Sequence, residues 1–178
     1  MDTRRKDFEA RVLVHLDAGL RLAKALVGST AQAEDVVQDS VLRAFRGFDA
    51  LRGEDARAWF LAIVRNVGLS ALARGARRPL QPLPEGDCDA EWLTDPAPGP
   101  EAAYMADQAS DALAVALAAL APAYREILLL REVEELDYRA IAQVVGVKIG
   151  TVMSRLARAR AALRVQWHAI NEERHRDL

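Results

Sequence analysis

Apolar residues recur every three or four positions along most of the chain, and no segment alternates regularly between apolar and polar residues. This spacing is typical of amphipathic helices that bury one face. The pattern therefore predicts an all-α fold. The buried face of the first predicted helix is formed by Phe8, Val12, Leu16, Ala23 and Leu26.

A second helix is predicted to begin at Ser29. Gln32 follows three residues later, which is the spacing of a capping box, and Glu34 and Asp35 suit the positive end of the helix dipole. The apolar side of this helix is predicted to carry Val37, Val41, Ala44, Phe45 and Phe48. A polar stripe on another side consists of Asp35, Asp39, Arg43 and Arg46.

A third helix is predicted from about residue 56 to residue 74, after a loop with the sequence DALRGED. Its inner face is expected to contain Phe60, Ile63, Val64, Val67 and Ala71. Its outer face places Asn66, Ser70 and Arg74 at a spacing of four residues, so their side chains lie one above the other.

Residues 77–100 contain all but one of the seven prolines. Proline cannot donate a backbone hydrogen bond within a helix and disfavours helix at the preceding residue. An irregular segment of this length is also unusual inside a compact domain. We therefore expect a flexible proline-rich linker that joins two small helical domains, at residues 1–76 and 101–178.

The second domain is predicted to contain a helix near residues 103–120 and another from about 123 to 133, with Pro122 in its first turn. A short amphipathic helix in LDYRAIAQVVG follows, and Gly146 supplies a tight turn before a long basic helix. Two helices joined in this way form a helix-turn-helix. The residues expected to pack its two helices together are Leu136, Ile141, Val144, Val147 and Val152.

Charge is distributed unevenly, although the net charge is only -2. The segment 79–104 has six acidic residues and no basic one, whereas the segment 138–164 has six basic residues and no acidic one. Arginines at positions 155, 158, 160 and 164 share one helix without an acidic residue between them. Like charges on a helix repel one another, so this helix is expected to need a partner of opposite charge.

DNA is the partner that this pattern favours, because the second helix of a helix-turn-helix enters the major groove with its first turn foremost. A phosphate is expected at Thr151 and the backbone near Gly150, where the helix dipole favours an anion. Base edges or phosphates are expected at Ser154, Arg155 and Arg158, and the DNA backbone at Lys148 and Arg139. The alternative is an amphipathic helix whose arginines are only solvated.

The sequence contains no pattern typical of a metal site or of a catalytic site. Cys88 is the only cysteine, and the three histidines at positions 15, 168 and 175 lack metal-ligand spacing. We therefore predict no enzyme, catalytic residue, metal or cofactor. Charged residues interrupt the apolar run near the start of the chain, so we expect neither an export signal nor membrane insertion, and a cytoplasmic location.

The segment LAPAYREILLLREVEELDYRAIAQVVGVKIGTVMSRLARARAALR resembles region four of bacterial sigma factors of the extracytoplasmic-function (ECF) group. The segments AEDVVQDSVLRAF and DARAWFLAIVRNVGLSALAR resemble region two of the same group. The resemblance covers about residues 8–76 and 112–165, in the order and spacing of the family. Met153 departs from it, because lysine is common there.

This resemblance implies that the chain binds core RNA polymerase, through the clamp helices of the beta-prime subunit and through the beta subunit, and directs promoter recognition, promoter melting and transcription initiation. The polymerase contacts that it implies in region two are Asp35, Gln38, Asp39 and Arg43. The basic track implied for the melted minus-ten element is Arg52, Arg57, Arg65, Asn66, Arg74, Arg77 and Arg78. Trp59 fits either the core or a platform for an unstacked base. Region four would read the minus-35 element with Arg139, Lys148, Gly150, Thr151, Ser154, Arg155 and Arg158.

The resemblance also implies an anti-sigma factor as a partner, because ECF factors are commonly held inactive by one. The tail after Arg164 is too short for a built-in inhibitory domain, so we expect regulation from outside. The acidic linker fits either a mimic of a nucleic-acid backbone in the polymerase cleft or a solvated tether. Two other functions stay open: a stand-alone helix-turn-helix regulator, and an adaptor that sequesters an anti-sigma factor.

Overall fold

The computed structural model describes residues 2–51, 55–75 and 108–176, and every regular element in these ranges is a helix. The prediction of an all-α fold is therefore confirmed. The predicted linker at residues 77–100 and the ends of the two domains beside it lie outside the described residues.

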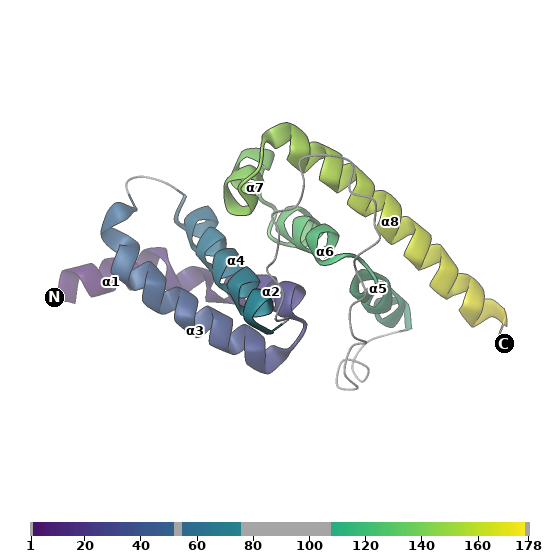
Figure 1. Ribbon diagram of the computed structural model, residues 1–178, viewed down its shortest axis with the longest axis horizontal. Coiled ribbons are helices and arrows are strands. Elements are labelled where there is room, and N and C mark those ends of the chain that lie inside the picture. Colours follow the sequence, from purple (N-terminus) through teal and green to yellow (C-terminus); the bar gives the residue numbers. More distant parts are fainter. Residues whose placement is uncertain (1, 52–54, 76–107, 177–178) are drawn as a thin grey trace.

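The N-terminal domain is built from four α-helices and two short 3-10 turns (Figure 1). These elements are α1 (Asp2–Arg11), η1 (Leu13–His15), α2 (Leu16–Val27), α3 (Thr30–Gly47), η2 (Phe48–Ala50) and α4 (Ala56–Gly75). Helices α2, α3 and α4 pack against one another, and α1 extends along α3 (Figure 1).

The C-terminal domain is built from four further helices and one π-helical turn. These elements are α5 (Gln108–Ala118), α6 (Pro122–Leu128), η4 (Leu129–Val133), α7 (Tyr138–Val145) and α8 (Ile149–Arg176). Pro122 occupies the first turn of α6, as predicted. The long helix α8 runs along one side of this domain and contacts α5, α6 and α7 (Figure 1).

The first predicted helix is wrong in one respect, because η1 divides it into α1 and α2. The division has a packing reason. Phe8 in α1 meets the rings of Phe45 and Phe48 edge-on, with centroid distances of 5.1 and 5.3 Å. Helix α2, by contrast, packs against both α3 and α4. Apolar spacing alone does not show that the two stretches bury their faces against different partners.

Helix α3 begins where predicted, and the Ser29 hydroxyl accepts a hydrogen bond from the backbone N–H of Gln32 at 3.5 Å. Of the predicted apolar stripe, Ala44 and Phe48 are buried, and Val37 and Val41 are half-buried and pack against the core. The buried residues of α3 also include Ala33, Val36 and Ser40. Phe45 was predicted to be buried, but it is 37% exposed. Both α2 and α4 pack against α3.

Glycines allow α2 and α4 to approach each other closely. A Cβ atom at Gly19 would lie 2.9 Å from Cε1 of Phe60, and one at Gly68 would lie 3.1 Å from Cδ1 of Leu26. The first distance is shorter than real Cβ contacts allow. Helix α2 therefore packs against α4 at a distance that only glycine permits at position 19.

The two domains share one hydrophobic core. Helix α4 lies against α7, and α2 lies against α6, so the central cluster of buried residues runs from Phe8 in α1 to Ala159 in α8. Figure 1 shows this meeting of α4 with α7 and of α2 with α6 in the middle of the molecule. The N-terminal helices therefore pack directly on the face of the C-terminal domain that also supports the helix-turn-helix.

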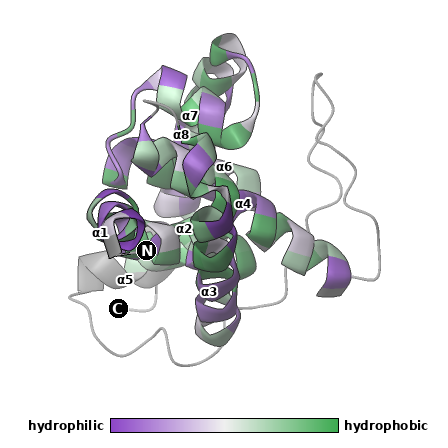
Figure 2. Ribbon diagram, turned by 90° about the vertical axis from the view of Figure 1, so that its left-hand side faces the viewer, coloured by the Kyte–Doolittle hydropathy of each residue, from purple (hydrophilic) through white to green (hydrophobic). Residues whose placement is uncertain are grey.

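Most helices have an apolar face that packs on its neighbours and a polar face that is exposed. Figure 2 shows the resulting mixture of hydrophilic and hydrophobic residues along α3. Within the described ranges, no helix by itself has the length and apolar composition to cross a bilayer. Helix α7 and residues 149–170 of α8 pass that test only as a pair bent by 96°.

Gly19→Ala should lower the free energy of unfolding because its new methyl group would collide with Phe60. Overpacking of this kind costs about 1–3 kcal/mol. Gly150→Ala is the matched control, since it makes the same exchange in a helix but meets no atom within 4 Å. Urea unfolding should show Gly19→Ala to be less stable than the control by about 1–3 kcal/mol. Equal stabilities would contradict the close approach of α2 and α4.

Candidate nucleic-acid interface

Helices α7 and α8 form a helix-turn-helix whose geometry is set by two residues. The Asp137 carboxylate accepts a hydrogen bond from the backbone N–H of Ala140 at 2.7 Å and so caps the start of α7. Gly146 ends α7 in the left-handed conformation, with a φ of 75°. Its N–H and that of Val147 both donate to the carbonyl of Ala142. The two helices cross at 96°, as expected for this motif.

The predicted packing of this motif is correct, because Leu136, Ile141, Val144 and Val152 are all buried and Val147 packs against them. The backbone N–H groups of Thr151 and Val152 donate to the carbonyl of Lys148, at 3.0 and 3.1 Å. The hydroxyl of Ser154 donates to the carbonyl of Thr151 at 3.1 Å. The first turn of α8 is therefore ordered by its own hydrogen bonds.

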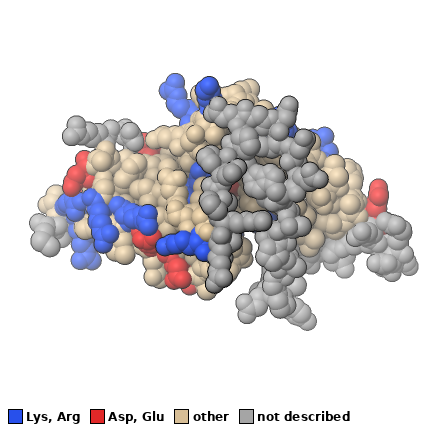
Figure 3. All heavy atoms as spheres, in the orientation of Figure 1, with Lys and Arg blue, Asp and Glu red and all other residues tan. Residues whose placement is uncertain are grey.

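Most side chains predicted to contact the minus-35 element lie on one exposed edge of the C-terminal domain. The exposed residues are Arg139, Lys148, Gly150, Ser154 and Arg158, whereas Thr151 and Arg155 are half-buried. Figure 3 shows basic side chains projecting from the edge formed by α7 and the start of α8. This edge can present positive charge to a nucleic-acid backbone.

Arg160 belongs to the same basic helix and is also exposed, but it pairs with an acidic residue of its own domain. Its Nη2 and Nε atoms lie 2.6 and 3.1 Å from one oxygen of Glu132, in η4. Arg131, also in η4, donates to the carbonyl of Leu136 and stacks over the ring of Tyr138. The chain thus supplies part of the counter-charge of this helix itself, which the sequence analysis did not foresee.

The polar stripe on α3 is also on the surface. Asp35, Gln38 and Arg43 are exposed, and Asp39 is half-buried and accepts a hydrogen bond from Arg43 at 2.8 Å. Leu42 lies beside them and is 56% exposed, and Phe45 also reaches the surface. Apolar spacing did not reveal this part of the surface, because Phe45 follows the period of the core-facing residues.

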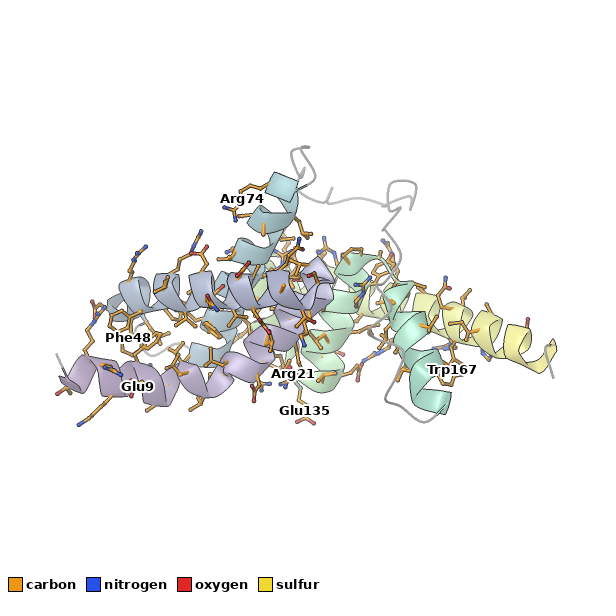
Figure 4. The ribbon with its side chains drawn as sticks, turned by 90° about the horizontal axis from the view of Figure 1, so that it is seen from below. Glu9, Arg21, Phe48, Arg74, Glu135 and Trp167 are labelled. Carbon is orange, nitrogen blue, oxygen red and sulfur yellow. The ribbon has the colours of Figure 1, made fainter. Side chains whose placement is uncertain are left out.

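The residues predicted for the minus-ten element divide into three groups. Asn66 and Arg74 on α4 are exposed, and Figure 4 shows Arg74 at the end of α4, away from the C-terminal domain. Arg52, Arg77 and Arg78 lie outside the described residues. Arg57 and Arg65 form ion pairs with carboxylates of the C-terminal domain, namely Glu134 and Glu126. Trp59, on the same helix, is half-buried and packs against the core.

Glu134 lies at the centre of the contact between the domains. Its side chain has no exposed surface, and its carboxylate accepts hydrogen bonds from Arg21 in α2 and from Arg57 in α4. Arg21 binds it with two nitrogen atoms, at 2.6 and 3.1 Å. Figure 4 shows Arg21 close to Glu135, the neighbour of Glu134, where the domains meet.

Glu126 forms a second pair across the same contact. Nε of Arg65 lies 2.6 Å from its carboxylate, and the two side chains are only 12% and 3% exposed. Glu126 is followed directly by a run of apolar residues, Ile127 to Leu130, and a carboxylate at the edge of such a run is the signal that could have revealed its burial. A third cross-domain contact joins the guanidinium of Arg125 to the carbonyl of Ala25, at 3.2 Å.

Burial and neighbouring charges change the pKa values of three titratable side chains, and the direction differs among them. Burial raises the pKa of Glu126 above its ordinary value of 4.5, although Arg65 and Arg155 act against this. Burial also acts to raise the pKa of Glu134, but hydrogen bonds and charges from Arg21 and Arg57 outweigh it, so this pKa is lowered. Burial and the charge of Arg57 lower the pKa of His15.

No group of three histidine, cysteine, aspartate or glutamate side chains is placed to hold a metal ion, as far as the structure describes the chain. What the described residues do form is two surfaces of different kinds. One is a basic edge on a helix-turn-helix, and the other is a mixed charged and apolar stripe on α3. An arginine-rich contact between carboxylates and guanidinium groups joins the domains that carry them.

Comparison with known proteins identifies the family. Residues 12–78 match the family model for Sigma-70 region 2, and residues 110–163 match that for Sigma-70, region 4. The ECF RNA polymerase sigma-E factor of Salmonella typhimurium is 31% identical over 138 residues, which cover 72% of this chain and 70% of that protein. The chain belongs to the ECF sigma factors. The helix-turn-helix is thus part of sigma region four, and α3 is part of sigma region two.

Other sigma factors agree with this assignment. ECF RNA polymerase sigma factor SigE of Mycolicibacterium smegmatis is 34% identical over 150 residues, or 84% of this chain. The chain spans only 57% of the length of that relative. The sigma factor RpoE from Bartonella quintana, solved in complex with the anti-sigma factor NepR, superposes with a TM-score of 0.67 and 25% identity. That match covers 90% of this chain and 96% of the solved one, so it includes both domains of this sigma factor.

Glu126 and Glu134 should titrate on opposite sides of 4.5, with Glu126 above it and Glu134 below it. The pairing of Glu134 stabilises the fold above pH 4.5, and that contribution is lost as the pH falls through its lowered pKa. Glu126 acts in the opposite sense, because its contribution to stability falls as the pH rises through its raised pKa. Carboxyl ¹³C chemical shifts measured across an acid titration test both directions.

Arg21→Ala should raise the pKa of Glu134, since it removes two hydrogen bonds to the carboxylate. Arg160→Ala is the matched control, because its partner is Glu132 and the pKa of Glu134 should not change. A carboxylate at position 134 that titrates at its ordinary value in the unsubstituted protein would contradict the buried contact.

Proposed function

We propose that this chain is a sigma factor that binds core RNA polymerase and directs promoter recognition, promoter melting and transcription initiation. The observation that carries the proposal is the pairing of the two sigma regions, in order, with a helix-turn-helix that presents an exposed basic edge. In this proposal the chain acts in the cytoplasm, where it supplies specificity to another enzyme, and no residue of its own is catalytic.

Region four is proposed to read the minus-35 element with the basic edge of α7 and α8. Arg158 and Ser154 are exposed on α8 and are suited to base edges or phosphates. Arg139 and Lys148 are exposed beside them and are suited to the DNA backbone. Thr151 and Gly150 lie in the first turn, where the helix dipole favours a phosphate.

Region two is proposed to bind the polymerase with α3. Asp35, Gln38, Asp39 and Arg43 supply polar contacts for the clamp helices of the beta-prime subunit, and the exposed apolar side chain of Leu42 adds surface that is removed from water on binding. A centre with apolar area and a polar rim is the usual composition of a protein interface. The beta subunit is proposed as a further contact of the same assembly.

Promoter melting is proposed to use α4. Separating the strands costs stacking free energy, on the order of 1.4 kcal/mol per step. Capture of the single strand by a basic track offsets part of that cost. Asn66 and Arg74 are exposed and can take this role directly. Arg57 and Arg65 can bind DNA only after their ion pairs with Glu134 and Glu126 are broken.

An anti-sigma factor is proposed as a regulatory partner. RpoE of Bartonella quintana was solved with the anti-sigma factor NepR, and its match covers 90% of this chain. The exposed stripe on α3 is a surface that such a partner could cover to prevent polymerase binding. Purification of the tagged protein from its native host with no such partner would count against this part of the proposal.

Transcription in vitro with core polymerase on genomic fragments, with the start sites mapped, tests the proposal as a whole. New start sites that depend on the chain are expected. Binding of the isolated protein to duplex DNA without any effect on core polymerase would instead indicate a stand-alone regulator. Failure to reach a promoter even with core polymerase would indicate an adaptor.

The double variant Asp35→Lys/Asp39→Lys should abolish binding to core polymerase, because it reverses the charge of the α3 surface. Asp7→Lys, which reverses an exposed carboxylate on α1, is the matched control and should bind normally. Fluorescence anisotropy of labelled protein titrated with core polymerase measures both. Normal binding by the double variant would exclude α3 as the docking surface.

Arg158→Ala should leave core binding intact and weaken recognition of the minus-35 element by about 1–3 kcal/mol. Binding of the assembled holoenzyme to promoter fragments with and without that element measures the difference. An equal loss on both fragments would mean that Arg158 contacts only the DNA backbone. A loss of binding to core polymerase would contradict the assignment of Arg158 to the DNA-binding surface.

A further inference from the structure

We propose that Phe45 is a docking residue for core RNA polymerase, and that helix α1 positions it through Arg4. Phe45 is 37% exposed near the end of α3, and the guanidinium of Arg4 lies over its ring. The match to sigma region 2 begins at residue 12, after the end of α1, so it assigns this helix no role. The inference rests on the proposed function, because it adds an anchor to the α3 surface proposed to bind polymerase.

One face of α1 is directed at the end of α3. Arg4, Phe8 and Arg11 follow one another at spacings of four and three residues, so they share this face. The ring of Phe8 meets those of Phe45 and Phe48 edge-on, and the guanidinium of Arg11 lies 5.6 Å from the centroid of the Phe48 ring. Figure 4 shows Phe48 between α1 and α3. Since Phe8 and Phe48 are both buried, α1 is held on α3 by apolar packing.

Arg4 adds polar contacts to this packing. Its Nε atom lies 3.0 Å from one carboxylate oxygen of Asp49, and its Nη2 atom lies 3.1 Å from the other. The same Nη2 atom donates to the backbone carbonyl of Phe45 at 2.8 Å. The guanidinium carbon lies 4.6 Å from the centroid of the Phe45 ring. One side chain of α1 therefore contacts both the backbone and the ring of Phe45.

The end of α3 explains why arginine suits this position. Carbonyl groups in the last turn of a helix lack partners within the helix, and the helix dipole makes this end negative. Phe45 lies in the last turn of α3, and the carboxylate of Asp49 adds negative charge just beyond it. The charge of Arg4 offsets both. Lysine would supply the charge but not the paired N–H groups that hold a carboxylate in one orientation.

The result is an aromatic ring that is exposed and yet held in place. The edge of Phe8 is 5.1 Å away at an interplanar angle of 83°, and Arg4 lies over the face of the ring. A side chain that is already ordered loses less conformational entropy when a partner binds it. Aromatic residues are also enriched among the few residues that dominate the binding free energy of an interface. Phe45 is therefore suited to be an anchor as long as α1 holds it.

Polymerase is the partner that the position of Phe45 favours, because this residue continues the stripe proposed to meet the clamp helices. Asp35, Gln38, Leu42 and Phe45 follow one another at spacings of three, four and three residues, and all four are exposed. They therefore lie along one face of α3. Leu42 and Phe45 place apolar area between the polar residues of this stripe and the exposed Arg46. An apolar centre with a polar rim is typical of a contact with protein.

The test is a double-mutant cycle in binding to core polymerase, measured by fluorescence anisotropy with the full chain. Arg4→Gln should weaken binding by roughly 2- to 10-fold, because the ring must then be ordered on binding. Phe45→Ala should weaken binding at least as much. In the Phe45→Ala protein, Arg4→Gln should cause no further loss, since Arg4 acts through the ring. Arg5→Gln is the matched control and should bind normally, because Arg5 is 75% exposed and pairs with Glu9 of its own helix.

The cycle separates positioning of the ring from general support of the fold. If Arg4 only stabilised the domain, Arg4→Gln would weaken binding equally with and without the ring, and that result would overturn its positioning role. Normal binding by Phe45→Ala would overturn the docking role of Phe45. Asp49→Asn is a second variant in case Arg4→Gln does not fold, since it removes a partner of Arg4 that is 77% exposed. It should weaken binding only when the ring is present, and any other result would also overturn the positioning.

Photocrosslinking tests the contact directly. p-Benzoylphenylalanine at position 45 keeps an aromatic ring there, and irradiation of this protein with core polymerase should give an adduct with the beta-prime subunit. Adducts formed only between two copies of this chain would assign the surface to self-association and overturn the proposal. An adduct with the beta subunit alone would place Phe45 away from the clamp helices, which would also overturn it.

Failure of this inference and failure of the proposed function give different results. If Asp35→Lys/Asp39→Lys abolishes binding to core polymerase while Phe45→Ala binds normally, α3 remains the docking surface and only the inference fails. If the unsubstituted chain does not bind core polymerase, both are overturned. Circular dichroism and thermal melting of each variant show whether its helices and stability are retained.

Discussion

A fully buried carboxylate is tolerated only where positive charge and hydrogen bonds surround it, and Glu134 is in this situation. Its two arginine partners belong to the N-terminal domain, so the chain can bury this residue only when its domains are together. Glu126 repeats the arrangement with Arg65 across the same contact. The shared core between α4 and α7 and between α2 and α6 supplies apolar burial around these pairs. The ion pairs make this contact selective, because an apolar face alone would accept other partners.

Helix α7 connects this contact with the basic edge of the helix-turn-helix. It packs on α4 of the N-terminal domain with one part of its surface and on α8 with another. Asp137 fixes its start and Gly146 fixes its end, so the orientation of α7 relative to α8 is set by local interactions. Any change in the domain contact is then a change in where the basic edge lies relative to α4.

The sequence allowed the helices and the motif to be predicted, because both depend on local rules. The cap at Ser29, Pro122 in the first turn of α6 and the glycine turn at position 146 each act within a few residues. The break between α1 and α2, the exposure of Phe45 and the burial of Glu134 depend instead on which distant helices cover each face. Periodicity identifies a face but not the segment that covers it, so charged residues 77 and 113 positions from Glu134 could not be assigned to it.

The arginines of α4 illustrate why residue type alone leaves a site undecided. Arg57, Arg65 and Arg74 share one helix and one chemistry, yet only Arg74 is exposed, at the end of α4 away from the C-terminal domain. A guanidinium that suits a phosphate suits a carboxylate equally well, because both present paired oxygens to the same fork of N–H groups. In an acidic protein with abundant arginine, an internal carboxylate is therefore always a competitor for a nucleic-acid contact. Whether a given arginine serves the fold or the DNA depends on the position of the opposing domain, which is a property of the conformation as much as of the sequence.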